Sequence, residues 1–183
     1  WLTIYFLYLS IVKVGQDFYS FGWETMILEA GYFTAFMGPE WVTPSWIPIL
    51  ILRWMLFRTE MGAGLIKLRG DSCWRDLTCL YYHHETQPLP NPLSRFFHHG
   101  PKWFHRFGVV FSHFCQLVAP IGLFFPQPVA MFAAGFLIVH QLILVVSGNY
   151  SWLNCLTIVL GFLAIPDFVT LETAPRPLWF ELI

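Results

Sequence analysis

The sequence predicts an all-α protein, a polytopic transmembrane helical bundle of about five to six membrane segments with one polar loop. Of its 183 residues, 56% are hydrophobic and only 11% are charged, whereas soluble domains carry about 25% charged residues. The apolar residues form runs of about fifteen to twenty, a length that suits the roughly 30 Å hydrocarbon core of a bilayer. The formal net charge of -1 provides no basic face, so we expect the lipid bilayer and not nucleic acid as a partner.

The first two apolar segments are the least certain membrane spans. Residues 1–14 resemble the remaining part of a spanning helix that ends near Lys13, and the absence of a starting methionine leads us to expect a fragment of a longer chain. Residues 21–37 are apolar but contain Glu24 and Glu29. Because this segment is at the lower limit for crossing a bilayer, it either spans the membrane or lies at its surface.

Residues 46–68 form an apolar run that contains Arg53, Arg58 and Glu60. The Ile, Leu and Phe side chains favour insertion by about 3 to 5 kcal/mol in total, whereas each central charge opposes it by about 2.5 to 3.5 kcal/mol. The two contributions nearly cancel, so this helix needs partners for its charges. We expect Arg58 to pair with a carboxylate of the preceding segment, either Glu24 or Glu29.

The spacing of the charges in this run predicts a polar seam on one helix face. Arg53, Glu60 and Lys67 are seven residues apart, so they lie on nearly the same face, about 10.5 Å from each other along the axis. That separation is too long for direct pairing, and a seam that faces a cavity or the bundle interior fits better. Gly62 and Gly64 would allow another helix to approach closely.

Three further apolar segments, 107–125, 129–147 and 151–165, complete the bundle. Their short connections predict antiparallel neighbours. Pro120 should kink or unwind the first of the three, and His140 lies at membrane depth. We therefore expect a membrane helical domain over residues 1–167, with its polar loop at about 68–103, and an exit tail over 168–183 that leads to a missing region.

The stretch from Gly62 to Pro92 is the main polar island, and we expect it to form a binding or structural platform. Burial of the Trp74 ring, ion pairs between arginine and acidic side chains, and Pro88, Pro90 and Pro92 would give it order. The candidate platform residues are Arg69, Asp71, Trp74, Arg75, Asp76, His83, His84 and Glu85. Six of the ten basic residues border or lie in the 67–106 loop, which predicts a cytoplasmic location by the positive-inside rule.

The histidines and cysteines do not follow a recognised zinc pattern, so we expect no metal and no cofactor. Cys73 and Cys79 would lie on different faces if the segment between them were helical. A disulfide between them would require an oxidising compartment and a loop geometry, and the sequence leaves that pairing open.

The segment from Arg53 to His99, which includes WRDLTC and ETQPLPNP, resembles the lipase maturation factor family, as does the later segment from Val146 to Leu160. The likeness extends from Glu29 to Asp167. It implies a polytopic membrane protein of the endoplasmic reticulum, or of the inner membrane if the source is bacterial. Its function would be chaperone-like, assisting the folding and assembly of secreted lipases, its clients, and it would not be an enzyme.

A second resemblance provides the alternative function. The AGLIKL string from Ala63 to Leu68, together with His140, is similar to the membrane portion of vitamin K-dependent carboxylases. That likeness implies an enzyme in which Lys67 is the base, because a lysine at the edge of the hydrocarbon can lose its proton on desolvation. The simpler interpretation is that Lys67 extends to the solvated interface beside Arg69 and Asp71, and that His140 hydrogen-bonds to a neighbouring helix.

Overall fold

The computed structural model describes residues 1–19, 21–38, 44–87, 89–150 and 152–165, and within these ranges all regular secondary structure is helical. The predicted exit tail, residues 168–183, lies outside the described residues. The α-helices are α1 (Leu2–Gly15), α2 (Gly22–Thr34), α3 (Trp46–Arg69), α4 (Ser72–Arg75), α5 (Leu80–His83), α6 (Ser94–His98), α7 (Lys102–His113), α8 (Ala119–Gly122), α9 (Val129–Ser147) and α10 (Leu153–Phe162). Single turns of other helix types are η1 (Gln16–Tyr19), η2 (Ala35–Met37) and the π-helical η3 (Phe114–Val118).

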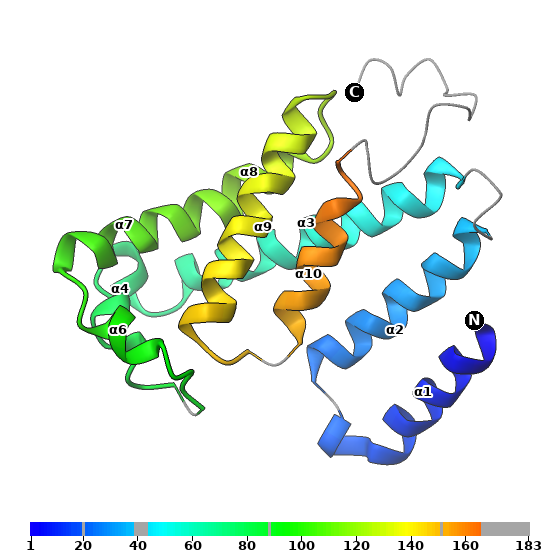
Figure 1. The fold of residues 1–183 in the computed structure, drawn as a ribbon, viewed down its shortest axis with the longest axis horizontal. Coiled ribbons are helices and arrows are strands. Elements are labelled where there is room, and N and C mark those ends of the chain that lie inside the picture. The colour runs from blue at the N-terminus through cyan, green and yellow to red at the C-terminus, as the bar shows by residue number, and fades with distance from the viewer. Residues whose placement is uncertain (20, 39–43, 88, 151, 166–183) are drawn as a thin grey trace.

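Helix α3 is the element around which the bundle is arranged. It contacts α2 on one side and η3, α8 and α10 on the other. Figure 1 shows α1 and α2 as an outer pair beside α3, with α7, α9 and α10 forming the rest of the bundle. Leu52, Met55 and Leu56 on the inner face of α3 are almost completely buried in the hydrophobic core. This core fixes α3 against the C-terminal helices, whereas α1 has no buried residue.

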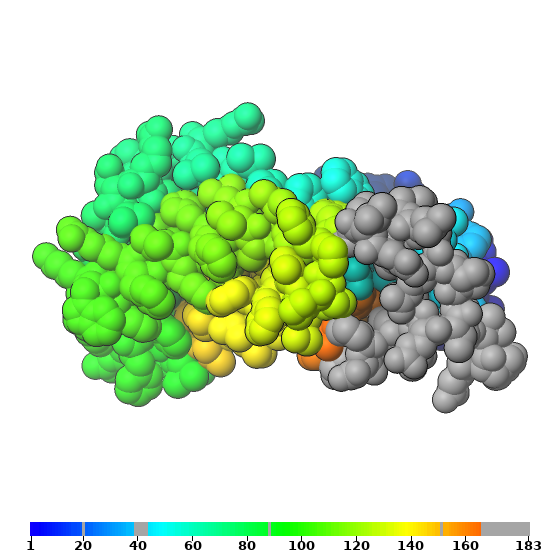
Figure 2. Space-filling model, turned by 90° about the horizontal axis from the view of Figure 1, so that it is seen from above, coloured from blue at the N-terminus to red at the C-terminus, as the bar shows by residue number. Residues whose placement is uncertain are grey.

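Small residues bring the C-terminal helices close together. Ala133 and Ala134 on α9 are buried, and a Cβ added at Gly122 on α8 would lie 2.8 Å from the Cβ of Ala133. Gly161 on α10 likewise has no room for a Cβ beside Ile138. Close backbone approach through small side chains is the usual packing of helices in membranes. In Figure 2 the segments from α6 to α9 form one continuous surface on the face in view.

Among the described residues, α9 is the one helix both long and apolar enough to cross a membrane by itself. Helix α3 has the length but carries the predicted charges, and α2 is only 13 residues long. The elements α7, η3 and α8 follow one another without a break, so they form a longer helical run interrupted by a π-helical turn. The all-helical architecture is confirmed, and the number of membrane spans, five to six, stays a prediction.

The π-helical turn has a physical cause in the sequence. Pro120 has no backbone N–H and its ring displaces the carbonyl one turn before it, so the regular hydrogen-bond pattern cannot continue through this point. The widened turn η3 lies directly before Pro120, at residues 114–118. The prediction that Pro120 unwinds this helix is therefore confirmed.

Candidate functional site

The polar seam on α3 exists and faces the bundle interior. Arg53 donates from Nε and a terminal nitrogen to the carbonyl oxygen of Leu163, at 3.1 and 2.8 Å. Glu60, 1% exposed, accepts a hydrogen bond from Gln141 of α9. Lys67 donates to Ser112 Oγ at 3.0 Å and to Gln116 Oε1 at 2.6 Å. Each charge of the seam therefore has its own polar partner on another segment, and these partners are neutral groups.

The seam continues across α9 to α10. Gln141 donates to Glu60 and accepts a hydrogen bond from Nδ2 of Asn154 at 2.6 Å. Three buried side chains from three helices thus form one chain of hydrogen bonds. Such a network is stabilising only when its members are satisfied, because each unmet buried polar group costs about 1 to 3 kcal/mol.

Four buried polar atoms on α3, α9 and α10 lack a hydrogen-bond partner within the described ranges. Glu60 Oε2, Asn154 Oδ1 and both ring nitrogens of His140 are buried, and none has a hydrogen-bond partner among the described residues. The His140 ring is packed against the ring of Phe111, with 6.1 Å between the centroids. The expectation that His140 hydrogen-bonds to a neighbouring helix is wrong for the part of the chain that the structure describes.

The expectation that Lys67 extends into solvent is also wrong. Its ammonium group turns inward to Ser112 and Gln116 and lies 4.8 Å from the ring centroid of Trp74. The first two contacts lie on the run that contains the π-helical turn, and the third lies in the polar loop. Lys67 therefore connects the intramembrane seam to the polar loop.

Only one of the two predicted glycines supports this arrangement. A Cβ added at Gly64 would lie 2.6 Å from Leu117 Cδ2 and 3.0 Å from Gln116 Cβ, so Gly64 lets η3 approach α3. At Gly62, nothing lies within 4 Å of such a Cβ. The prediction is therefore confirmed for Gly64 and wrong for Gly62 within the part of the chain that the structure describes.

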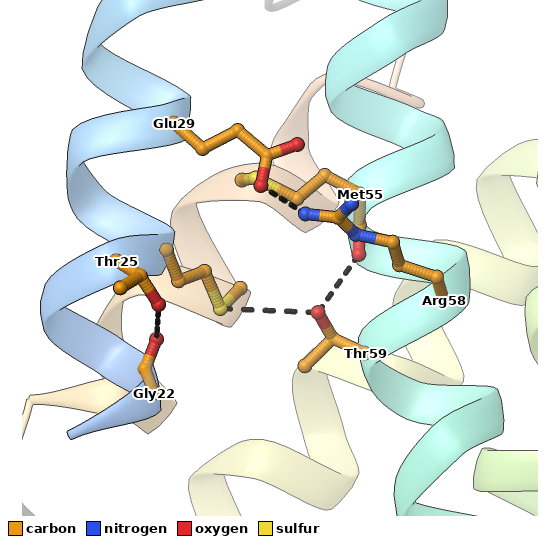
Figure 3. A network of polar contacts seen from close by, with 7 residues as sticks. Gly22, Thr25, Glu29, Met55, Arg58 and Thr59 are labelled. Atoms are coloured by element: carbon orange, nitrogen blue, oxygen red, sulfur yellow. Dashed lines mark hydrogen bonds and ion pairs between the residues drawn. The ribbon is translucent and has the colours of Figure 1, made fainter. Parts of the chain in front are cut away.

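The opposite side of α3 carries a direct ion pair. Arg58 pairs with Glu29 of α2, and Figure 3 shows the two side chains meeting between the helices. Their side chains are 47% and 33% exposed. Glu24, the other candidate, accepts a hydrogen bond from Tyr8 of α1 instead. The predicted pairing of Arg58 is thus confirmed, with Glu29 as the partner.

The polar loop is held by a disulfide between Cys73 and Cys79, whose Cα atoms are 4.7 Å apart. The expectation that these residues lie on different helix faces fails because α4 ends at Arg75 and Leu77 has a φ of 59°. A positive φ at a non-glycine residue marks a sharp turn, which folds Cys79 back onto Cys73. The pairing that the sequence left open is therefore present.

Trp74 is partly buried, and its ring contacts three other side chains. Its backbone carbonyl accepts a hydrogen bond from His113 Nε2 at 3.0 Å, and its ring lies 6.3 Å from the rings of both His83 and His113. Together with the Lys67 ammonium group, these contacts place Trp74 at the junction between the loop and the bundle.

The expected ion pairs within the platform are not formed. Among the described residues, neither Arg69 nor Arg75 forms an ion pair with Asp71, Asp76 or Glu85. Asp71 instead accepts from the backbone N–H of Cys73 at 2.9 Å, and so caps the start of α4. The arginines are exposed to solvent, where an ion pair contributes little. The loop is thus ordered by its disulfide and Trp74 contacts.

One further platform residue, Glu85, has a partner that the sequence did not predict. Glu85 pairs with the imidazole of His98 at 3.3 Å. Pro90 and Pro92 are exposed. Pro88, the first of the three prolines expected to stiffen this exit, lies outside the described residues.

The two histidines of the platform are shielded from solvent, with His83 partly buried and His84 buried. His83 Nε2 lies 2.7 Å from the Tyr150 hydroxyl, in the connection between α9 and α10. Burial lowers the pKa of His83 and raises the pKa of Tyr150. Burial, followed by the nearby His83 and His105, lowers the pKa of His84 to about 4. In the part of the chain that the structure describes, no three His, Cys, Asp or Glu side chains converge as metal ligands would.

Sequence reasoning missed the amide side chains that complete the seam. Gln116, Gln141 and Asn154 are buried and contact, directly or through one another, the charges of α3. The available signal was their position within apolar runs, because polar side chains at membrane depth usually bond to other helices. A search limited to charged residues did not identify these amides.

These features define a helical membrane domain whose charged central helix is matched by polar groups on its neighbours. The chain matches the family model described as the lipase maturation factor transmembrane domain over residues 1–171. It is 47% identical over 165 residues to lipase maturation factor 1 of Bos taurus and 48% identical over 161 residues to that of Homo sapiens. The chain belongs to the lipase maturation factor family, and no solved structure matches it.

The likeness covers most of this chain and a minor part of its relatives. The alignments include 86% and 84% of the chain but 29% and 28% of the Bos taurus and Homo sapiens proteins. Lipase maturation factor 2 of Xenopus tropicalis is 35% identical over 170 residues, which are 87% of the chain and 24% of that protein. The chain therefore spans less than a third of the length of these relatives.

Proposed function

We propose that this chain is the membrane region of a multi-pass maturation factor of the endoplasmic reticulum that assists the folding and assembly of secreted lipases. The observation that carries the proposal is the family match over residues 1–171. The relatives are named for lipase maturation, and the polar loop provides a surface that a lipase client could contact. If the source is bacterial, the corresponding location is the inner membrane.

The disulfide supports a location for the loop. Disulfides persist in oxidising compartments such as the endoplasmic reticulum lumen and the periplasm, and are rare in the cytosol. The Cys73–Cys79 bond therefore favours the lumenal side for the loop, opposite to the side that charge counting predicts. We give the disulfide more weight, because the positive-inside rule is a statistical bias.

The platform combines a fixed interior with an exposed charged surface. The disulfide and the Trp74 contacts hold the backbone, while Arg69, Arg75, Asp76 and Glu85 are exposed. A surface of this kind could recognise a folding client by shape and charge without catalysing a reaction. The chaperone function thus depends on the order of the loop more than on any single titrating group.

The test is secreted lipase activity per unit of lipase protein in cells that lack the endogenous factor and express full-length variants. Trp74→Ala should lose most maturation activity, because removal of a packed aromatic ring costs about 3 to 5 kcal/mol when fully buried and somewhat less here. Arg95→Ala changes an exposed residue outside the disulfide-bonded segment and should retain activity. Normal maturation by an abundant Trp74→Ala variant would contradict the proposal.

A second candidate function, a membrane enzyme of the vitamin K-dependent carboxylase type, is favoured by one observation. Lys67 lies inside the bundle, and His140 has two ring nitrogens without partners among the described residues. Against it, the contacts to Ser112, Gln116 and the Trp74 ring account for the three N–H groups of a charged lysine. A base must give up one of those protons.

Lys67→Arg separates the two functions. Arginine keeps the positive charge but cannot act as a base near neutral pH, because its pKa exceeds 12. The chaperone proposal expects an abundant Lys67→Arg variant to retain most lipase maturation. An abundant but inactive variant would favour the enzyme. Lys67→Ala is less informative, since it leaves Ser112, Gln116 and Glu60 without their cation and should lower abundance.

A further inference from the structure

One side of the helical run formed by α7, η3 and α8 carries a stripe of exposed apolar side chains. They recur every three or four residues, as positions on one helix face do. They are Trp103, Phe107, Val110, Phe114, Val118 and Ile121. At about 1.5 Å per residue the stripe is roughly 27 Å long, close to the thickness of the hydrocarbon core of a bilayer. Since the chain matches a family of transmembrane domains, lipid acyl chains are the surroundings that this stripe fits.

The stripe begins beside two exposed basic side chains, Lys102 and Arg106, which lie one turn apart on α7. Both contact Tyr81 of α5. Arg106 Nε donates to the Tyr81 hydroxyl at 2.9 Å, and the Lys102 ammonium group lies 5.9 Å from the centroid of the same ring. The Tyr81 ring packs against buried His105, with 5.7 Å between the centroids. The two cations are therefore held near each other, where the polar loop meets the bundle.

Within the part of the chain that the structure describes, this basic pair has no acidic partner. Neither Lys102 nor Arg106 forms an ion pair there, and the sequence contains no Asp or Glu between Glu85 and Asp167. The contact with Tyr81 uses Arg106 Nε, which leaves the terminal nitrogens of the guanidinium group available to a ligand. Uncompensated cations attract an anionic partner. A partner that also covers the adjacent stripe must be amphipathic.

We propose that Lys102, Trp103 and Arg106 bind the headgroup of an anionic phospholipid whose acyl chains lie along the apolar stripe of α7, η3 and α8. Basic side chains are attracted to anionic lipids at a membrane surface, and tryptophan is enriched at the level of the headgroups. Because Tyr81 belongs to the polar loop, a lipid bound here also holds that loop against the membrane surface. The site does not depend on lipase maturation.

Native mass spectrometry of the full-length protein in detergent, titrated with phosphatidylserine or with phosphatidylcholine, tests the proposal. The readout is the dissociation constant of the first lipid that remains bound. Each basic residue beside an anionic headgroup contributes about fivefold in affinity. We therefore expect phosphatidylserine to bind at least about fivefold more tightly than phosphatidylcholine. The double variant Lys102→Gln with Arg106→Gln should weaken phosphatidylserine binding by at least about tenfold and leave phosphatidylcholine binding unchanged.

Arg75→Gln is the matched control, because Arg75 is an exposed basic residue of the polar loop outside this site. It should keep the phosphatidylserine affinity of the unmodified protein. If the double variant does not fold, Lys102→Gln alone, which loses no hydrogen bond, should lower that affinity by about fivefold. Equal affinities of the unmodified protein for the two lipids would overturn the proposal. So would a loss in Arg75→Gln as large as the loss in the variants of the site.

Two further outcomes distinguish a lipid from other anionic partners. Glycerophosphoserine, which has the headgroup without the acyl chains, should not displace phosphatidylserine at equal concentration. Displacement would show a site for free phosphate compounds and overturn the assignment to a lipid. A double variant that binds phosphatidylserine normally but no longer matures lipases would assign the basic pair to the client, and would also overturn the proposal.

Discussion

The two faces of α3 stabilise a charged side chain by different kinds of contact. On the outer face, Arg58 is half-exposed and meets the carboxylate of Glu29 directly. On the inner face, two residues further along, Glu60 is 1% exposed and meets the neutral amide of Gln141. The outer charge is in direct contact with an opposite charge, whereas the inner charge contacts neutral side chains and has Lys67 as its nearby opposite charge.

The difference shows which charge the fold depends on. An exposed ion pair can lose one member and let solvent or a lipid headgroup satisfy the other, so each partner contributes little by itself. A buried group cannot recruit a new partner, and removing any member of its network leaves the rest unmet. We therefore expect substitutions on the inner face of α3 to cost more than those on the outer face.

The largest effect should follow from Glu60→Ala. Removing the carboxylate leaves Gln141 without its acceptor and Lys67 without a nearby negative charge, and the loss of one member of a buried charged network costs about 3 to 5 kcal/mol. The measurement is the free energy of unfolding in mixed detergent and dodecyl sulfate micelles.

Glu60→Gln is the matched control, since it keeps the shape and one acceptor oxygen. It should lose about 1 to 3 kcal/mol, less than the alanine variant. Equal stability of Glu60→Ala and the unmodified protein would mean that the inner network does not support the fold.

The sequence predicted that the charges of α3 form an inward-facing seam, but it did not predict which residues contact that seam. The seven-residue spacing of Arg53, Glu60 and Lys67 was sufficient to predict an inward seam, because helix periodicity is local. Which atoms meet that seam depends on how α9 and η3 pack against α3, and this is tertiary information. The positions of Gln141 and Asn154 could therefore not be assigned to Glu60 from sequence.

Two errors in the polar loop have a similar origin. Opposite charges close in sequence, such as Arg75 and Asp76, suggested pairing, but both side chains are exposed and gain little from it. The turn at Leu77 that brings Cys79 to Cys73 requires a positive φ at a leucine, which local preferences do not predict.

On the outer face, a double-mutant cycle should detect a smaller effect. Arg58→Leu and Glu29→Leu should each cost about 1 to 2 kcal/mol, because the remaining charge loses its partner but is half-exposed. The double variant should cost less than the sum, with a coupling energy of at least about 0.5 kcal/mol. Unfolding in the same micelles gives all four values, and additive losses would show that the two side chains do not interact.

Substitutions of Gly62 and Gly64 allow the same two faces of α3 to be compared without changing any charge. Gly64→Ala would place a Cβ against Leu117 and Gln116, and the resulting shift of η3 should cost about 1 kcal/mol after the gain in helix propensity. Gly62→Ala meets nothing within 4 Å and should be neutral or stabilising by up to about 1 kcal/mol. If Gly62→Ala were the more destabilising of the two variants by thermal unfolding, this assignment of the two faces would be wrong.

The smallest effect should be a pH dependence in the polar loop, where buried His84 can be compared with exposed His99. The pKa of His84 is lowered from its ordinary 6.5 to about 4, mainly by burial and then by the nearby His83, His105 and His98. Between these two values the unfolded loop binds a proton that the folded loop does not, so the folded loop loses stability as pH falls below 6.5. Above pH 6.5 this contribution should not vary.

Hydrogen exchange of the amides in residues 79–87, corrected for intrinsic rates, measures this loss at pH 7.5 and pH 5.5. Protection should decrease at the lower pH in the unmodified protein and in His99→Phe. It should decrease less in His84→Phe, which keeps a ring beside Phe97, now 5.6 Å away between centroids, and removes the titrating group. If His84→Phe lost as much protection as the unmodified protein, the pH dependence would have to arise from another group, with the His83 imidazole beside Tyr150 as the next to test.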